Sequence, residues 1–233
     1  TLFCKAEDNS LINAGVMLDG DVSSKLGLAG ISYLSEVLHV SRMIEIARHF
    51  KIRILFKAIA SPRSVMLINS AKREGVDVSC EVSIHHLVHS DKACEDFNTW
   101  AKLNPPLSSY EDMQELQKML SCGQIDMLTT LHEPSSPVNK EVAFFDAAYG
   151  CSTLSVALPL YYTKLVKSGL ISMSELIKLA SYNSAKSIAK EAGVIAVGAA
   201  ANLVLFDINA TTQVDDIGSL YNRELLSGKV ILF

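Results

Sequence analysis

The chain has 233 residues, with 21 lysines and arginines against 25 aspartates and glutamates, and a formal net charge of −4. This acidic balance argues against nucleic acid or an anionic membrane surface as the main partner. Hydrophobic residues make up 49%, which excludes a disordered chain, and no run of about 18 apolar residues is present to span a bilayer. The five cysteines are scattered without a C-x-x-C pair, so we expect reduced thiols and a cytoplasmic protein.

Strands and helices are predicted to alternate through the first half of the chain. Apolar residues at helical spacing predict a helix over Ser35–Phe50. The elements predicted after it are strand Ile52–Ile59, helix Ser64–Glu74, strand Val76–Ser83, helix Tyr110–Ser121 and strand Ile125–Thr130. Such alternation implies parallel strands joined by right-handed crossovers, and therefore an α/β layer architecture or barrel.

The pattern changes after Ser152. Three helical patterns are followed by short apolar runs that are typical of strands. The predicted helices are Leu154–Ser168, Met173–Ala180 and Ala185–Ala192, and the predicted strands are Val194–Val197, Asn202–Asp207 and Lys229–Phe233. We therefore expect a small β element appended to the barrel-like part.

Histidines are the first candidates for a hydrolase or metal site. His85 and His86 follow the predicted strand Val76–Ser83, at the end where barrel enzymes keep active-site residues. On the loop predicted there, adjacent histidines point in different directions, so a structural hydrogen-bonding role competes with a ligand role. His132 follows the next strand and is a weak candidate for catalysis by itself.

A proline pair shapes the loop that follows Lys102. Pro105 and Pro106 force extended geometry and could present the side chain of Asn104 into a cleft. The chain has no G-x-S-x-G, no phosphate-binding loop and no H-E-x-x-H motif. The residues alone therefore support part of an α/β barrel and no complete catalytic set.

The order and spacing of many segments resemble the dihydroorotases, cyclic amidohydrolases of de novo pyrimidine biosynthesis that interconvert carbamoyl aspartate and dihydroorotate. The matching segments are Lys5–Asp8 (KAED), Gly15–Ser32, Ser64–Val76, Glu81–Asp91, Lys102–Leu107 (KLNPPL), Asn139–Gly150, Ala157–Val166 and Gly193–Asp207. The resemblance implies a partial TIM barrel of the metal-dependent amidohydrolase type plus the C-terminal part of a small β-sandwich domain. Residues 1–192 would be the later half of the (β/α)8 barrel and residues 193–233 the C-terminal strands.

The resemblance covers only the later part of such a protein. The family opens with strands that carry an H-x-H metal motif and a further acidic or carboxylated-lysine ligand, and no such segment is present. A half-barrel would have open edges. We therefore expect another segment or another chain to complete the barrel, and a homo-oligomer is one way to do so.

Four family positions are substituted within the covered region. Lys5 stands where the family has the metal-binding histidine of H-x-E-D, and Ala58 stands at the next ligand histidine. In the family's D-H-A-P-H segment, Leu131 replaces the catalytic aspartate and Ser135 replaces the substrate-contacting histidine. An ammonium repels a divalent cation, and neither a methyl group nor an isobutyl group can take a proton from water. We therefore expect no bound metal and no retained catalytic residue.

The resemblance leaves three functional hypotheses. The one we favour is a non-catalytic homologue, kept as a partner or scaffold of aspartate transcarbamoylase. The second is an active dihydroorotase, with zinc, whose site has been rebuilt from residues such as Lys5, His85 and His132. The third is a small-molecule binding protein with a pocket around Asn104. Candidate residues for a substrate pocket are Asn104, His132, Ser135 and His85.

Overall fold

The computed structural model of the chain describes residues 1–190 and 192–231. Its strands are β1 (Leu2–Lys5), β2 (Met17–Leu18), β3 (Gly30–Ile31), β4 (Ile54–Lys57), β5 (Val78–Ser83), β6 (Met127–Thr129), β7 (Leu205–Gln213) and β8 (Leu225–Ile231). Its helices are α1 (Asp21–Leu26), α2 (Leu34–Phe50), α3 (Pro62–Arg73), α4 (Ile84–Val88), α5 (Tyr110–Ser121), α6 (Pro137–Lys140), α7 (Ala157–Tyr161), α8 (Met173–Ile177) and α9 (Asn183–Ser187). The helix predicted over Leu154–Ser168 contains a π-helical turn at Tyr162–Val166. A second π-helical turn, Lys178–Tyr182, overlaps the end of the helix predicted over Met173–Ala180.

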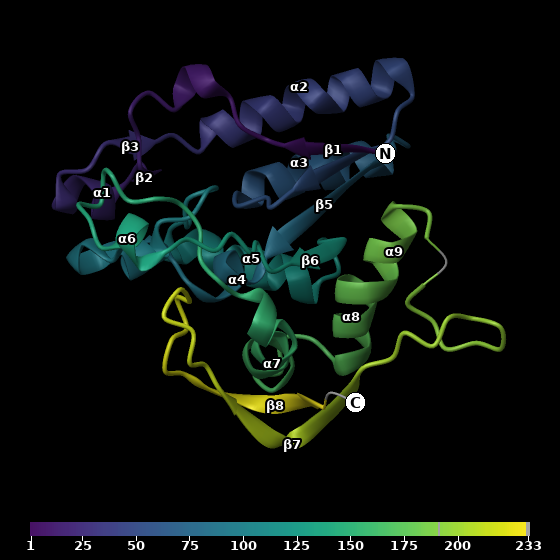
Figure 1. Cartoon of the computed structure of the whole chain (residues 1–233). Helices are drawn as coiled ribbons and strands as arrows, with labels where there is room; N and C mark the ends of the chain where they lie inside the picture. The colour runs from purple at the N-terminus through teal and green to yellow at the C-terminus, as the bar shows by residue number, and fades with distance from the viewer. Residues whose placement is uncertain (191, 232–233) are drawn as a thin grey trace.

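The main sheet is parallel and has the order β1-β4-β5-β6, as the alternation of strands and helices predicted. β1 and β4 pair in register, so that Lys5 lies opposite Lys57 at their carboxyl ends. β4 then pairs with β5 and β5 with β6, also in parallel. Helices α2, α3 and α5 connect these strands and lie along the sheet (Figure 1), which is the arrangement of part of a TIM barrel.

Helices α2, α3 and α5 lie close to their predicted positions because their sequences carry clear boundaries. Pro62 occupies the first turn of α3, where its missing N–H costs nothing. Ser109 caps α5 by accepting a hydrogen bond from the N–H of Asp112 at 3.1 Å. Past the C-terminal ends of α3 and α5, Gly75 and Gly123 adopt positive φ angles of 83° and 69°.

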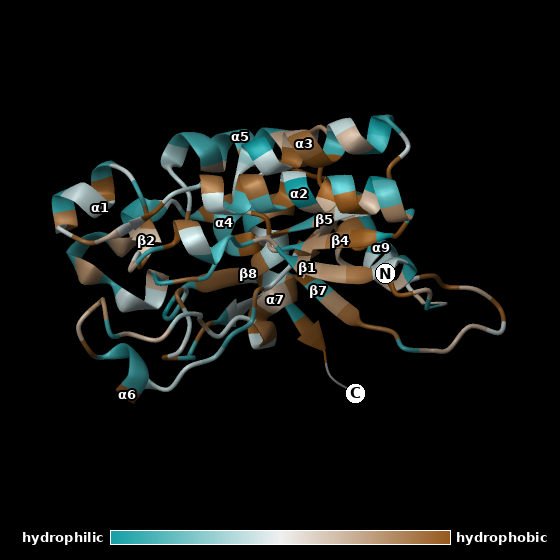
Figure 2. Cartoon of the chain, turned by 90° about the horizontal axis from the view of Figure 1, so that it is seen from above, coloured by the Kyte–Doolittle hydropathy of each residue, from teal (hydrophilic) through white to brown (hydrophobic). Residues whose placement is uncertain are grey.

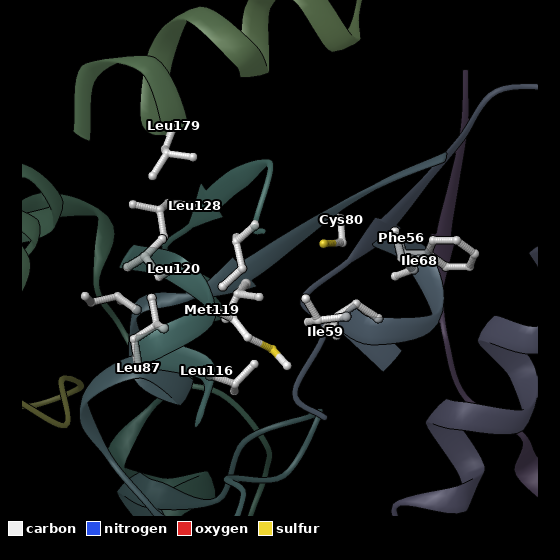
Figure 3. Close-up of a cluster of buried hydrophobic side chains, with 14 of the residues drawn as sticks. Phe56, Ile59, Ile68, Cys80, Leu87, Leu116, Met119, Leu120, Leu128 and Leu179 are labelled. Atoms are coloured by element: carbon white, nitrogen blue, oxygen red, sulfur yellow. The ribbon is translucent and has the colours of Figure 1, made fainter. Parts of the chain in front are cut away.

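The hydrophobic core lies between the sheet and these helices. Figure 3 shows side chains of β4 and β5, among them Phe56 and Cys80, near Ile68 of α3, and Leu116 of α5 in the same cluster. All four are fully buried, with 0% relative exposure. Burying apolar side chains is the main favourable contribution to folding, so this cluster fixes how the strand ends that form the site are arranged.

The C-terminal segment is an antiparallel hairpin that packs against the barrel. β7 and β8 pair from Leu205 to Ile231, and α7 lies between this hairpin and the sheet (Figure 1). The buried residues Val214, Tyr221 and Leu226 belong to the same hydrophobic cluster as the barrel helices. The predicted boundary between residues 192 and 193 stays a prediction.

Four predictions near the C-terminus were wrong in part, and one of them is the strand Asn202–Asp207, which is realised as β7 over Leu205–Gln213. Val194–Val197 is not a strand, because its apolar side chains are exposed and no neighbouring strand pairs with it. The predicted helix Ala185–Ala192 is realised as α9, which ends at Ser187, and its residue 191 lies outside the described residues. The last predicted strand is β8, which begins earlier, at Leu225, and residues 232–233 also lie outside the described residues.

Polarity follows the layers of the fold. Figure 2 shows hydrophilic and hydrophobic stretches alternating along α2, α3 and α5, whereas β1 and β4 are mostly hydrophobic.

No helix within residues 1–190 and 192–231 is both long enough and apolar enough to cross a membrane. Of the five cysteines, only Cys122 is exposed, and all five thiols are free.

Candidate functional site

Two lysines lie at the carboxyl ends of neighbouring strands. Lys5 ends β1, Lys57 ends β4, and the two are register partners, so their side chains leave the same face of the sheet. The ammonium of Lys5 forms an ion pair with Glu7 at 3.2 Å, and about half of the Lys5 side chain is exposed. A lysine that is paired with a carboxylate therefore lies where the resemblance implies a metal ligand.

Ala58 and Leu131 hold an uncommon backbone conformation. Ala58 directly follows β4 with φ of 49°, and Leu131 follows β6 with φ of 45°. The left-handed region costs an ordinary residue about 1–2 kcal/mol and persists where the surrounding structure enforces it, often at functional sites. The backbone at both positions thus keeps a strained geometry, while the side chains offer no donor atom.

His85 and His86 lie on the short helix α4, and the prediction of a loop was wrong. Ser83 caps this helix by accepting the N–H of His86, which allows a helical turn to begin directly after β5. Both imidazoles are fully buried. Burial lowers the pKa of His85 to about 3 and that of His86 to about 4, so both rings are neutral at pH 7.

All four ring nitrogens of these histidines have hydrogen-bonding partners. Nδ1 of His85 lies 2.9 Å from the hydroxyl of Tyr221, and its Nε2 lies 3.2 Å from the hydroxyl of Thr153. His86 bonds through Nδ1 to Ser83 at 2.7 Å and through Nε2 to the carbonyl of Pro106 at 3.1 Å. The adjacent histidines point to different partners, as we expected for neighbours in sequence. Both rings make hydrogen bonds within the fold.

His132 and Ser135 lie in the segment after β6. Nδ1 of His132 accepts hydrogen bonds from the N–H groups of Thr153 at 3.0 Å and Leu154 at 3.1 Å, although the residue is largely exposed. His132 also bridges in parallel to Cys151, which extends the sheet past β6. Ser135 is half-buried in the same segment.

A cavity opens beside the ends of β1 and β4, with a volume of about 580 Å³ that includes space open to solvent. Asn104 and Lys5 line this cavity, whereas His85, His132 and Ser135 do not. The structure therefore brings one of the four predicted pocket residues to the cavity and separates it from the other three. The second hypothesis, an active enzyme with a rebuilt site, needs Lys5, His85 and His132 close together. Of these three residues, Lys5 alone lines the cavity.

Glu36 is a buried carboxyl group in this cavity that sequence reasoning missed. Its Oε2 accepts the N–H of Ala60 at 2.9 Å and its Oε1 accepts the N–H of Ser61 at 3.0 Å, so the first turn of α2 is tied to the turn before α3. Burial raises its pKa to about 7, against the opposing effect of the Ser64 hydroxyl and of these two N–H donors. An acidic residue in the first turn of a helix is common, so its position in sequence gave no distinguishing signal.

The side chains present do not fit a zinc ion. Structural and catalytic zinc sites need three or four converging His, Cys, Asp or Glu donors. Within residues 1–190 and 192–231, no three such side chains converge. The nitrogens of His85 and His86 are already hydrogen-bonded, and the ammonium of Lys5 has no lone pair to give to a metal. No metal-dependent step follows from this donor set.

A parallel β/α sheet with candidate residues after its strand ends defines a segment of a β/α barrel of the kind that enzymes use. The chain belongs to the Amidohydrolase family, whose model matches residues 38–220. Among curated proteins it is 40% identical over 208 residues to the dihydroorotase of Elusimicrobium minutum (strain Pei191), covering 89% of this chain and 48% of that protein. It is also 37% identical over 209 residues to the dihydroorotase of Acetivibrio thermocellus, covering 90% of this chain and 49% of that protein.

Solved structures agree on the fold. The chain superposes on the L-hydantoinase (dihydropyrimidinase) from Arthrobacter aurescens with a TM-score of 0.88 and 25% identity, over 99% of this chain and 54% of that one. It superposes on the dihydropyrimidinase from Brevibacillus agri NCHU1002 with a TM-score of 0.83 and 18% identity, over 98% and 54%. The predicted dihydroorotase-like amidohydrolase fold is confirmed, and the chain spans about half the length of the relatives it matches.

Proposed function

We propose that this chain is a dihydroorotase-like protein of pyrimidine biosynthesis that has no metal-dependent turnover and acts as a non-catalytic partner of aspartate transcarbamoylase. One observation carries the proposal: the backbone after the strands keeps a strained conformation, but the side chains at these positions cannot bind a metal ion. Ala58 and Leu131 keep strained backbones after β4 and β6 but have no donor atoms, and Lys5 places an ammonium at the end of β1.

The proposal of a partner rests on what such a chain retains. The parallel sheet and its core are intact although the side chains at the family's metal positions are substituted. A folded homologue without its chemistry keeps its surface and its ability to bind a neighbour, and function then belongs to the assembly. Four buried free cysteines are compatible with the reducing cytoplasm, where we place this protein.

Metal content and turnover test the catalytic half of the proposal. The full-length protein is analysed for zinc by elemental analysis and assayed for hydrolysis of dihydroorotate at saturating zinc. We expect substoichiometric zinc and no turnover. Stoichiometric zinc together with turnover that a chelator abolishes would overturn the proposal. The double variant Lys5→His with Ala58→His serves as a control, because it restores two donor side chains and should raise zinc retention above that of the native protein.

Association tests the partner half independently. We expect the native protein to co-purify with aspartate transcarbamoylase from its own cells and to co-elute with it when the two purified proteins are mixed. Elution of the two as separate species at micromolar concentration would contradict the partnership while leaving the absence of turnover standing.

A further inference from the structure

The cavity beside the ends of β1 and β4 has a second, apolar side that the family positions do not explain. Ile12, Leu18 and Ile31 come from the segment between β1 and α2, and they line the cavity together with Tyr33 and Pro105. Apolar walls with a few convergent polar groups are typical of small-molecule sites. All of these lining residues belong to this chain, so the cavity forms without a partner.

The charges in the cavity do not balance. Lys5 is paired with Glu7, which leaves Glu36 and Asp112 as further carboxyl groups in the lining. Neither of these two forms an ion pair with a lysine, arginine or histidine within residues 1–190 and 192–231. Burial raises the pKa of each carboxyl, and an entering cation would stabilise their ionised forms.

A second, independent observation is an unsatisfied hydroxyl. Ser108 lines the cavity, is 3% exposed, and its Oγ has no hydrogen-bonding partner among the described residues. Leaving a buried hydroxyl unpaired costs about 1–3 kcal/mol, which a bound donor or acceptor would recover. Glu36 accepts two backbone N–H groups and is approached by the hydroxyl of Ser64, while an ionised carboxyl offers about four lone-pair positions. The cavity therefore has unused acceptors for a ligand rich in N–H groups.

We propose that this cavity binds a small organic amine, whose apolar body lies against Ile12, Leu18 and Ile31 and whose ammonium is held by Glu36, Asp112 and the hydroxyl of Ser108. A metal ion does not suit the site, because no three His, Cys, Asp or Glu side chains within residues 1–190 and 192–231 converge on one point. This inference does not rest on the proposed function, since an amine could bind whether or not the protein turns over a substrate.

Calorimetric titration of the full-length protein with 2-phenylethylammonium tests the proposal. Phenylacetate and 2-phenylethanol are matched probes with the same ring and an anionic or neutral end. We expect the amine to bind at least about tenfold more tightly than either, because only it pairs with the desolvated carboxyl groups. Equal affinity for the alcohol, tighter binding of phenylacetate, or no binding of any probe would overturn it.

Variants locate the binding. Asp112→Asn and Ser108→Ala should each weaken binding of 2-phenylethylammonium by about fivefold or more, since each removes a group assigned to the ammonium. Glu111→Gln is the matched control, because Glu111 is the exposed neighbour of Asp112 on α5 and does not line the cavity. Should Asp112→Asn alter the fold, Ser108→Ala decides. Unchanged affinity in both folded single variants, Ser108→Ala and Asp112→Asn, contradicts the assignment. Weakening by Glu111→Gln as large as that by Asp112→Asn also contradicts it.

Discussion

At the residue scale, the polar centre of the fold is a group of buried histidines beside Tyr221. His85 stacks on the Tyr221 ring with centroids 5.6 Å apart, and the His89 ring lies 5.2 Å from it. The Nε2 atom of His89 is buried without a partner among the described residues. Burial lowers the pKa of His89 to about 4, as it lowers those of His85 and His86. These side chains therefore stabilise the fold only while they remain neutral.

Acid should unfold the protein through these histidines. Because the folded pKa of His89 lies below its unfolded value of 6.5, the unfolded chain takes up the proton first as pH falls. Its contribution is fully present above pH 6.5 and is lost as pH falls towards 4, by about 1 kcal/mol per pH unit. His89→Phe should lower the total slope by that amount in denaturant unfolding measured from pH 6.5 to 4.5, while the shares of His85 and His86 remain. A slope that His89→Phe leaves unchanged would contradict this cause.

Gly150 shows a second residue-scale constraint, next to the segment of His132. Its φ is 91°, and a Cβ there would clash with the backbone carbonyl of Glu133. Gly150→Ala should lower the free energy of unfolding by about 3 kcal/mol or more, from backbone strain and overpacking together. Gly123→Ala is the matched control, because Gly123 also has positive φ but open space around it, and it should cost about 1 kcal/mol. Equal losses in thermal unfolding would show that the clash is relieved.

At the element scale, agreement between sequence and structure depends on local boundary signals. The helix Tyr110–Ser121 was predicted to the residue with Gly123 as its stop signal, and the structure shows in addition that Ser109 caps its first turn. The short helix α4 escaped although Ser83 caps it, because it follows β5 without a break and its five residues are too few to show a helical period, so that His85 and His86 were placed on a loop. Val194–Val197 has the composition of a strand, but pairing depends on a neighbour that local sequence does not reveal.

The cap of α5 should carry a measurable share of stability. Ser109→Ala removes the acceptor for the N–H of Asp112 and should lower the free energy of unfolding by about 1 kcal/mol. Ser121→Ala, at the exposed last residue of the same helix, should change it by less than about 0.5 kcal/mol. A larger loss for Ser121→Ala in urea unfolding would contradict the assigned role of the cap.

The candidate site was predictable only in part, because some of its residues are positioned by neighbours in sequence and others by residues that are remote in sequence. Asn104 was expected in a cleft because two prolines restrict the residues around it, and it lines the cavity. Glu36 could not be singled out, because its environment is built by Ala60 and Ser61, which belong to the next β/α unit. Residues far apart in sequence create its burial, and local patterns do not encode such burial.

At the scale of the whole molecule, one edge of the sheet has no neighbouring strand among residues 1–190 and 192–231. Strand β1 is at one end of the strand order, and Leu2 and Phe3 on it are 46% and 47% exposed. An unpaired, apolar edge strand is a template for pairing with another chain. The partner could be a second copy or a different segment, and either would cover the same atoms.

Substitution on this edge should reduce self-association. Phe3→Glu places a charge on the exposed edge, and we expect a lower weight-average mass than for the native chain in sedimentation velocity at matched concentrations. Phe50→Glu is the control, because Phe50 is 65% exposed and lies at the end of α2 rather than on a strand. A lower mass for Phe50→Glu alone would place the self-association elsewhere.

The hydrogen bond between His85 and Tyr221 also bears on how the chain folds during synthesis. The two residues are 136 positions apart. At about 5–20 residues per second, the ribosome needs roughly 7 to 27 s to extend the chain from one to the other. During that interval the imidazole of His85 has no phenol to bond with, and the nascent barrel segment exposes the apolar surface that Tyr221 later covers. Chaperone binding to ribosome-bound chains should therefore end only after residue 221 has left the exit tunnel.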